Sequence, residues 1–223
     1  MTSSSNNPVR IDVVSDIVCP WCFIGKRRLE QAIALNPEIP VEVHYHPFFL
    51  NDWIPAEGIS REQYLTTKFG SPERYKDIAA RVAAAAEQDG LLYAIDKVSR
   101  QPNTTDSHRL IHWAALEGKA PEMKQRLMEL YFSQGADLSD KTVLVKAAAD
   151  IGLDADAVLR KLDSSEDLDV VSQRVEAAKA AGIQGVPFFI VDNKTALSGA
   201  QEPDQLAAVI QRAANEKAQK AAG

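Results

Sequence analysis

Two cysteines constrain this sequence more than any other feature. They are the only cysteines in 223 residues, and they bracket the motif Cys19-Pro20-Trp21-Cys22. Residues 9–17 alternate between apolar and polar side chains and include an apolar run, as a short buried strand does. In residues 23–35 the apolar side chains recur at helical spacing. Cys19 is therefore predicted at a strand-to-helix junction, where unpaired N–H groups and the helix dipole favour a thiolate. A thiolate at Cys19 is nucleophilic, and Cys22 can reach back to it.

The composition excludes several classes of protein. With 45% hydrophobic residues, the chain can bury a sizeable core as one large domain or as one domain with an insertion. A net charge of −6 argues against nucleic-acid and anionic-membrane partners. The sequence has no apolar run near the roughly 18 residues of a membrane span, and residues 1–8 do not resemble a signal peptide. We expect a cytoplasmic protein, in which such a cysteine pair is typically catalytic or metal-binding.

The order of the predicted elements indicates an α/β fold with a large all-α insertion. Strands are expected at 9–17, 41–45, 188–191 and 195–197. The order is strand, helix, strand, then helices over roughly 120 residues, then strand, strand, helix. Strands at the two ends of the chain must therefore pair across the inserted block. The expected divisions are a first part at 8–55, a helical insertion at 56–180, a second part at 181–216, and flexible termini at 1–7 and 217–223.

Helix-start signals divide the insertion into several helices. Ser60 with Gln63 forms a capping box, and Ser71 before Pro72 begins the next helix. Residues 91–103 have no clear period and are expected to be extended or loop. Later helix starts are expected at Thr104, Pro121, Ser139, Asp154, Ser164 or Ser165, and Pro203, and the last helix is expected to fray from Lys217.

Three groups of residues give the sequence a family resemblance. They are Ser15-Asp16-Ile17-Val18-Cys19-Pro20-Trp21-Cys22 with Ile24-Gly25-Lys26-Arg27-Arg28-Leu29, Asn103-Thr104 with Ser107-His108-Arg109-Leu110, and Gly185-Val186-Pro187-Phe188-Phe189. Over about residues 9–215 the chain resembles the DsbA-like branch of the thioredoxin superfamily, and within it the FrnE-like proteins. The resemblance implies a thioredoxin-like fold interrupted by a helical domain, and a dithiol–disulfide oxidoreductase or isomerase activity.

The cysteine motif supplies the parts for thiol–disulfide exchange. Cys19 attacks a substrate disulfide to form a mixed disulfide, and Cys22 resolves it. Pro20 and Trp21 shape the short loop and are expected to leave Cys19 exposed to substrate. The bland alternative is a pair of inert, buried cysteines.

Two positions far along the chain join this candidate site through the resemblance. The resemblance implies that Pro187 is a cis-proline facing the motif, and that the backbone at Val186 pairs with substrate as an added strand. The residues alone favour an ordinary trans proline at the first position of a strand. His108 lies within the matching residues and is a candidate to line the cleft near Cys19, where it can favour the thiolate. His112, four residues on, shares its helix face, and both are alternatively ordinary histidines with satisfied hydrogen bonds.

A zinc site is a second interpretation of the motif. Cys19 and Cys22 with His44 and His46 supply four ligand types, and two histidines two apart share one face of a strand. The spacing between these histidines is too short for the usual zinc finger. We therefore expect no bound metal.

Other polar and aromatic positions also allow two interpretations. Lys26, Arg27 and Arg28 are expected first as a solvated face, and alternatively as positive charge beside Cys19 or as partners for the carboxylates of a small thiol. Phe48, Phe49 and Trp53 are expected to pack at the domain junction rather than to contact substrate. These three aromatic residues are thus predicted to pack at the domain junction, and the alternative is that they form an apolar substrate groove beside the motif.

The sequence therefore predicts a thiol–disulfide oxidoreductase that acts on protein or low-molecular-weight thiols and disulfides. No cofactor is expected beyond a co-substrate such as glutathione or mycothiol, and a recycling thiol system is the expected partner. The alternative is a glutathione-type isomerase or transferase of the 2-hydroxychromene-2-carboxylate isomerase or kappa-class kind. The resemblance implies that those enzymes typically carry Ser where Cys19 stands. A zinc-stabilised binding module is a third possibility, and the direction of electron flow is left open.

Overall fold

Helices and strands follow one another in the expected order. The structure is a computed structural model that describes residues 7–222, so residues 1–6 of the N-terminus expected to be flexible, and Gly223, lie outside the described residues. The strands are β1 (Val9–Ser15), β2 (Val41–Pro47), β3 (Ile59–Ser60), β4 (Arg100–Gln101), β5 (Phe188–Val191) and β6 (Thr195–Ser198). The helices are α1 (Pro20–Ala34), α2 (Arg61–Phe69), α3 (Pro72–Gln88), α4 (Thr105–Leu116), α5 (Ala120–Phe132), α6 (Lys141–Asp150), α7 (Ala155–Leu162), α8 (Leu168–Ala180) and α9 (Pro203–Ala222).

Four strands form a mixed sheet in the order β2-β1-β5-β6. Strand β1 is parallel to β2, to which α1 provides the crossover, and antiparallel to β5. In this register Val13 lies opposite Tyr45 on one side and Phe189 on the other. Strands from the two ends of the chain therefore pair across the helical block, which confirms the predicted α/β fold.

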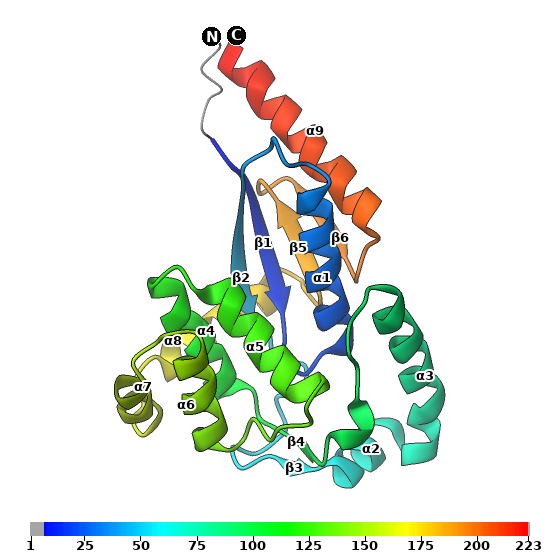
Figure 1. Ribbon diagram of the computed structural model, residues 1–223, viewed down its shortest axis with the longest axis vertical. Coiled ribbons are helices and arrows are strands. Elements are labelled where there is room, and N and C mark those ends of the chain that lie inside the picture. The colour runs from blue at the N-terminus through cyan, green and yellow to red at the C-terminus, as the bar shows by residue number, and fades with distance from the viewer. Residues whose placement is uncertain (1–6, 223) are drawn as a thin grey trace.

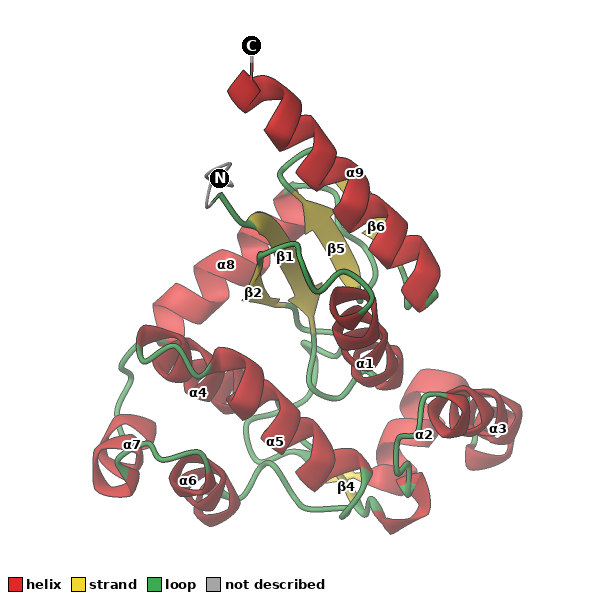
Figure 2. Ribbon diagram, turned by 45° about the horizontal axis from the view of Figure 1, so that its top comes forward, coloured by secondary structure: helices red, strands yellow, loops and turns green. Residues whose placement is uncertain are grey.

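Helices cover both faces of this sheet because side chains alternate along each strand. On one face Ile11 and Val13 pack against residues of α1 and α9, among them Leu29 and Leu206. On the opposite face Val14 packs with Ala178 near the end of α8 and with nearby loop residues. Figure 2 shows α1 and α9 on one side of the strands and α8 on the other.

The helical part shares its core with the start of α1. In Figure 1 the sheet, α1 and α9 make up the upper part of the molecule, and α2 to α7 make up a broader lower part. The apolar core of the lower part includes buried residues of α4 and α5, such as Leu110 and Leu127, and it also contains Cys19 and Cys22. Phe23, directly after the motif, stacks on Phe132 of α5 with ring centroids 5.3 Å apart. The cysteine motif therefore lies at the boundary between the two parts.

Several helix boundaries confirm the capping signals and others differ from the prediction. The side chains of Ser60 and Ser71 accept hydrogen bonds from the first turns of α2 and α3, as expected. Helix α1 begins at Pro20 rather than at residue 23, because proline is well suited to the first turn of a helix. Helix α6 is capped by Asp140 and not by Ser139, because the Asp140 carboxylate accepts the Thr142 N–H.

Three other segments also differ from the sequence-based prediction. Helix α8 begins at Leu168, after the left-handed residue Asp167, rather than at Ser164 or Ser165. Within the stretch 91–103, expected to be extended or loop, β4 is extended and pairs with β3 in a second, two-stranded sheet, and the part that differs is a short 3-10 helix at Ile95–Lys97. Helix α9 continues to Ala222, past the residue at which fraying was expected, and Lys217 pairs with Asp192 at 2.7 Å.

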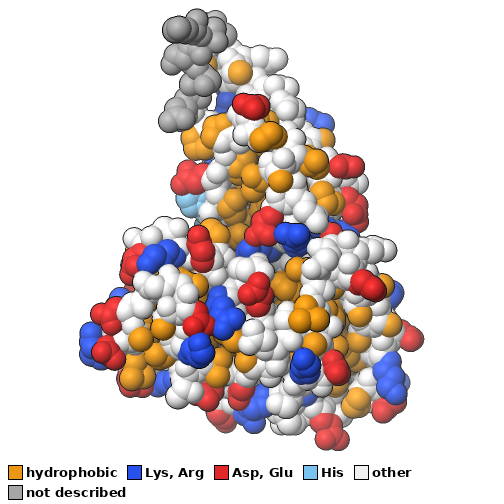
Figure 3. Space-filling view, in the orientation of Figure 1, with side chains coloured by type: hydrophobic (Ala, Val, Ile, Leu, Met, Phe, Trp, Pro, Cys, Tyr) orange, Lys and Arg blue, Asp and Glu red, His pale blue; other side chains and the backbone are white. Residues whose placement is uncertain are grey.

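The surface carries both signs of charge. On the face shown in Figure 3, basic and acidic side chains are interspersed over the broad lower part. A mixture of this kind is ordinary for a protein of modest net charge. Within residues 7–222, none of the helices combines the length and the apolar character needed to cross a membrane.

Gly25 allows α1 to approach the start of β5 closely. A Cβ atom added at Gly25 would stand 2.9 Å from Cγ of Pro187 and 3.3 Å from the ring of Phe189. A proline ring held by its own strand cannot move aside as a flexible side chain can. The absence of a side chain at residue 25 therefore fixes how near the helix after the motif lies to Pro187.

We expect Gly25→Ala to destabilise the protein by about 1–3 kcal/mol, the usual cost of overpacking, although alanine is the better helix former. Gly185→Ala is the matched control, because a Cβ atom at Gly185 meets nothing within 4 Å. Denaturant unfolding of the two variants and the parent protein measures the difference. Equal midpoints for the two variants would show that the α1–β5 contact tolerates a methyl group.

Candidate active site

Cys19 is the N-cap residue of α1. Its carbonyl oxygen accepts hydrogen bonds from the N–H groups of Cys22 at 3.0 Å and Phe23 at 3.2 Å, and its side chain makes no capping bond. Both cysteines are free thiols. The strand-to-helix junction predicted from the sequence is therefore where the structure places Cys19, at the positive end of the helix dipole.

The expectation that Cys19 is exposed is wrong. Its exposed fraction is 4% and that of Cys22 is 1%, whereas Trp21 between them is 38% exposed. Cys19 is covered because the segment before β5 lies across it, and its Sγ donates to the Val186 carbonyl at 3.5 Å. Within the motif, the surface that an approaching molecule meets first is therefore Trp21.

The pKa values of the two thiols are shifted from the ordinary thiol value in opposite directions. A hydrogen bond from the Cys22 thiol lowers the pKa of Cys19 against the effect of burial, and backbone N–H groups of Cys22 and Trp21 add to the lowering. Burial, together with the hydrogen bond that Cys22 gives to Cys19, raises the pKa of Cys22 well above its ordinary value. Cys19 is thus the thiol that ionises first, and Cys22 retains its proton.

Val186 and Pro187 lie beside the motif, although they are far from it in sequence. The Val186–Pro187 peptide bond is cis. The Val186 carbonyl contacts Cys19, and the Pro187 ring faces Gly25 of α1. The structure therefore brings these two predicted site residues together with the cysteine pair, as it does Pro20 and Trp21 of the motif itself.

Asp16 is a buried carboxylate that sequence reasoning did not assign to the site. It has no exposed surface. Its Oδ1 accepts the Ile17 N–H at 2.7 Å, and its Oδ2 accepts the Leu50 N–H at 2.8 Å. His108 Nε2 lies 3.2 Å from Oδ1, so His108 stands behind the motif and contacts Asp16 rather than lining an open cleft at Cys19. The available signal was a single acidic residue inside an apolar run three residues before Cys19.

Lys124 of α5 is the second buried charged residue near the motif. Its exposed fraction is 1%, its Nζ donates to Ser15 Oγ at 2.7 Å, and it lies 5.1 Å from the centroid of the Tyr45 ring. Burial lowers the pKa of Lys124 to about 8. A signal was present in the sequence, because Lys124 stands three and four residues from Leu127 and Met128, on the apolar face of its helix.

The prediction of a solvated basic face after the motif is wrong for two of its three residues. Lys26 is buried and binds Glu30 of its own helix and Gln125 of α5. Arg28 is buried and binds Asp89 and Glu202, each from a different part of the chain. The cause is the position of α1, which packs between α9 and the helical part. These side chains are occupied by protein partners, so they do not supply free positive charge beside Cys19.

A different cation lies on the side of Cys19. Lys68 Nζ donates to Asn51 Oδ1 at 2.5 Å, and Asn51 is 7% exposed with no partner for its Nδ2 group. Asn51 directly follows Leu50, whose N–H binds Asp16. Burial lowers the pKa of Lys68, while the negative charges of Cys19 and Asp16 oppose that effect. The Lys68 ammonium group therefore lies close enough to Cys19 and Asp16 to interact with their charges, and the Nδ2 group of Asn51 is a buried donor without a partner.

The aromatic residues after β2 have different environments. Phe48 is buried against Val14, as the packing prediction requires. Phe49 contacts the His108 ring at 5.9 Å between centroids. Trp53 is 44% exposed and stacks on Tyr64 at 6.2 Å, so it presents an aromatic face to solvent instead of filling the junction.

The four candidate zinc ligands do not form a site. His46 Nε2 lies 2.7 Å from Asp12 Oδ1, and His44 pairs with Glu42 at 3.0 Å. Across residues 7–222, no three His, Cys, Asp or Glu side chains gather closely enough to hold a metal ion. The histidines of β2 thus contact the carboxylates of Glu42 and Asp12 and not the cysteines.

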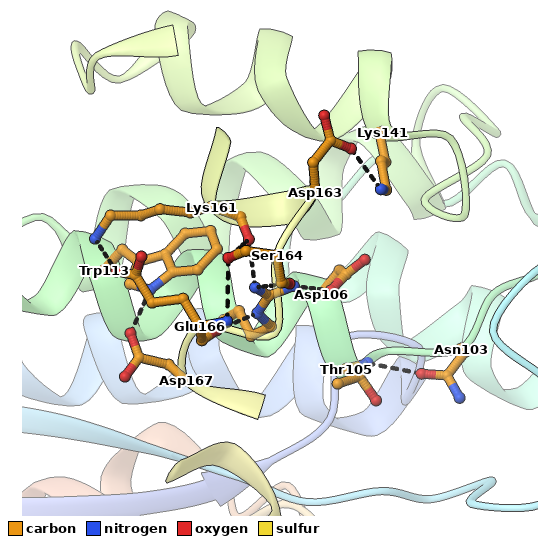
Figure 4. A network of polar contacts seen from close by, with 11 residues as sticks. Asn103, Thr105, Asp106, Trp113, Lys141, Lys161, Asp163, Ser164, Glu166 and Asp167 are labelled. Carbon is orange, nitrogen blue, oxygen red and sulfur yellow. Dashed lines mark hydrogen bonds and ion pairs between the residues drawn. The ribbon is translucent and has the colours of Figure 1, made fainter. Parts of the chain in front are cut away.

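Helix α4 connects the His108 side of the site to α8. Arg109 is buried and donates to three backbone carbonyls, those of Lys161, Ser164 and Glu166, and Trp113 Nε1 donates to Asp167 at 2.8 Å. Figure 4 shows these contacts converging on the segment between α7 and α8. They hold residues 163–167, between the two helices, in a non-helical form, which explains why α8 begins only at Leu168.

The sheet, the dithiol at a helix start and the proline that faces it define a thioredoxin-like protein with a dithiol site. Residues 10–211 match the DSBA-like thioredoxin domain, and the chain belongs to this family. The family supports an oxidoreductase activity in general.

Three known proteins are similar to this chain over most of its length. A probable DsbA oxidoreductase from Streptomyces coelicolor is 31% identical with a TM-score of 0.85, over 93% of this chain and 91% of that one. Bacillus subtilis YwbO, an uncharacterized protein, is 28% identical over 88% of this chain and 92% of its own length. The cytosolic disulfide reductase DsbM from Pseudomonas aeruginosa, solved with GSH, is 19% identical with a TM-score of 0.64, over 91% of this chain and 98% of that one. The DsbM similarity shows the fold alone.

We expect Cys22→Ala to raise the pKa of Cys19, because it removes the hydrogen bond that lowers this pKa most. Cys22→Ser is the matched control, since its hydroxyl can still donate to a thiolate. The measurement is the rate of iodoacetamide alkylation of Cys19 against pH, read by mass spectrometry. The midpoint of the parent protein should lie below the ordinary thiol pKa of about 8.5. Identical midpoints for the parent and the alanine variant would contradict this account.

Proposed function

We propose that this chain is a thiol–disulfide oxidoreductase in which Cys19 attacks and Cys22 resolves. The observation that carries the proposal is the position of two free thiols at the start of α1, where Cys19 is the N-cap residue and Cys22 is held against it. In this arrangement the pKa of Cys19 is lowered and that of Cys22 is raised. A low pKa gives the attacking thiolate, and a high pKa keeps the second thiol in reserve until a mixed disulfide has formed. Membership of the DSBA-like family supports the same class of chemistry.

The proposed cycle keeps atoms and electrons in balance. The Cys19 thiolate attacks one sulfur of a substrate disulfide, the other sulfur leaves as a thiolate and takes up a proton, and a mixed disulfide remains on Cys19. Cys22 then loses its proton and attacks Cys19 Sγ, which releases the second substrate thiolate. The substrate disulfide has been reduced to two thiols, and the dithiol has been oxidised to a disulfide. The same steps in reverse oxidise a substrate dithiol.

Val186 and Trp21 are the proposed contacts for the substrate around Cys19. The Val186 carbonyl is already within 3.5 Å of Cys19 Sγ, so a substrate that pairs with this backbone as an added strand would place its sulfur at the nucleophile. Trp21 offers an exposed apolar ring at the same place. Through Asp16, His108 is proposed to position the motif rather than to contact the substrate.

A low-molecular-weight thiol is the proposed co-substrate that recycles the dithiol. The ammonium group of Lys68, an exposed residue, suits a carboxylate, which glutathione carries and mycothiol lacks. DsbM, which shares the fold, was solved with GSH and is described as cytosolic. We propose glutathione before mycothiol, and a cytoplasmic location in which such a thiol is abundant.

The isomerase or transferase alternative has less support. In a glutathione-dependent isomerase or transferase, one hydroxyl or thiol group at the helix start contacts the sulfur of glutathione, and a second cysteine takes no part in the reaction. Here Cys22 is held against Cys19 and lowers its pKa. We therefore retain redox exchange as the proposed activity.

We expect Cys19→Ser to lower the rate of insulin reduction to the uncatalysed level, because a serine hydroxyl does not ionise at neutral pH. The rate is measured in an assay in which glutathione is the reductant. Cys22→Ser should instead trap a mixed disulfide on Cys19, visible as an added mass that dithiothreitol removes. Lys146→Met, which changes an exposed side chain of α6, is the control. Wild-type activity of Cys19→Ser would sink the proposed function.

We expect Lys68→Met to raise the KM for glutathione disulfide about tenfold, the effect of losing one charge-assisted hydrogen bond. The same variant should process the uncharged bis(2-hydroxyethyl) disulfide at the parent rate, since that substrate has no carboxylate. Steady-state kinetics with the two disulfides make the comparison. An equal loss with both substrates would mean that Lys68 supports the structure of the site and not the recognition of a carboxylate.

A further inference from the structure

A small cavity lies between the sheet and the helical part, behind the cysteine motif. Its volume is about 20 Å³, which is enough for a water molecule. Its polar lining consists of Tyr45, His46, His108, His112, Lys124 and Arg174. None of Cys19, Trp21 and Pro187 is part of this lining, so the cavity is separate from the proposed substrate side.

The lining of the cavity leads from the interior to the surface. At the inner end, Lys124 and His108 are buried. At the outer end, the His46 side chain is 35% exposed and Arg174 is exposed. His46 and Arg174 also line a larger groove of about 300 Å³ over the sheet, together with Arg10 and Asp12. The cavity therefore borders both the protein interior and a groove open to solvent.

Cys22 needs a route for its proton on this side. The thiol is buried, and it must lose its proton before it can attack the mixed disulfide. At that moment the substrate is bonded to Cys19 and covers the outer side of the motif. On the inner side the positive charge of Lys124 and the backbone N–H of Asp16 both favour the Cys22 thiolate. Lys124 Nζ donates a hydrogen bond to Ser15 Oγ at 2.7 Å, and Ser15 directly precedes Asp16 in the segment that leads to the motif.

We propose that Lys124 accepts the proton of Cys22 and that water in this cavity carries it to the surface. This inference rests on the proposed function, since it concerns the resolving step. The S–H bond of Cys22 breaks as the neutral Lys124 amine takes the proton, and the thiolate attacks Cys19 Sγ. The ammonium then gives its proton to water in the cavity, and His112 receives it at the outer end. In the oxidising direction the proton travels the opposite way.

The charges around Lys124 suit an acceptor that titrates near neutral pH. Burial and the nearby Lys26 of α1 lower its pKa, while Cys22, Asp16 and Cys19 raise it, and the result is about 8. The neutral amine therefore becomes more abundant as the pH rises through this value.

Further groups face the same space from other elements. Tyr45 and His46 come from β2, His108 and His112 from α4, and Arg174 from α8. Burial and the charge of Arg174 lower the pKa of His112, while Asp167, 3.9 Å from its Nε2, opposes this shift. In the proposed relay, His112 therefore passes the proton on to solvent and does not retain it.

Ellman's reagent separates the two thiol steps in a single turnover. Attack by Cys19 on the reagent releases one thionitrobenzoate, and attack by Cys22 on the resulting mixed disulfide releases a second. We expect Lys124→Met to leave the first release near the parent rate and to slow the second by about tenfold or more, the usual contribution of a positioned acid or base. Lys146→Met, an exposed lysine on α6, should leave both releases unchanged. A parent protein without a first release would refute the proposed function itself.

Two further variants test the proton step. Lys124→Arg retains the charge but cannot give up its proton, so its second release should be as slow as that of Lys124→Met. A parent-like second release in Lys124→Arg would overturn the proposal, because charge alone would then suffice. Ala115→Leu adds bulk at the cavity lining without changing Lys124, and should also slow the second release. If circular dichroism shows that the Lys124 variants are unfolded, Ala115→Leu decides, and an unchanged second release overturns the proposal.

Discussion

The carboxylate of Asp16 is the group on which the arrangement of the site depends. A carboxyl group without exposed surface is costly to bury unless its oxygens have hydrogen-bond partners, and the partners of Asp16 come from three segments. Ile17 belongs to the turn that carries the motif, Leu50 to the loop after β2, and His108 to α4. Because one side chain holds all three, the motif, the loop that presents Asn51 and the helical part keep a fixed relation.

Each part of the molecule supplies a different half of the chemistry. The sheet and α1 supply Cys19, its helix-start position and the Val186–Pro187 segment. The inserted helices supply His108 and Lys124, and their apolar core includes Cys19 and Cys22. Arg109 extends this arrangement, because the helix that carries His108 also fixes the segment leading into α8, and α8 covers the second face of the sheet.

Local features of the site and fold could be predicted from the sequence, and long-range ones could not. The strand-to-helix position of Cys19 and the caps at Ser60 and Ser71 depend on neighbouring residues, so the local pattern was sufficient. The burial of Cys19 depends on Val186, 167 residues away. The ion pair of Arg28 with Glu202 spans 174 residues, and no periodicity identifies such a partner. For the burial of Lys124, the one signal in the sequence was its spacing of three and four residues from Leu127 and Met128, which places it on the apolar face of its helix.

The pairing of β1 with β5 has a consequence for the synthesis of the chain. The cysteine motif leaves the ribosome 167 residues before Val186, so the segment that covers Cys19 is synthesised long after the motif itself. Until then β1 has only β2 beside it, and contacts of such sequence separation form slowly. A nascent chain of this kind therefore carries both thiols of the motif without this cover while the 167 residues up to Val186 are synthesised.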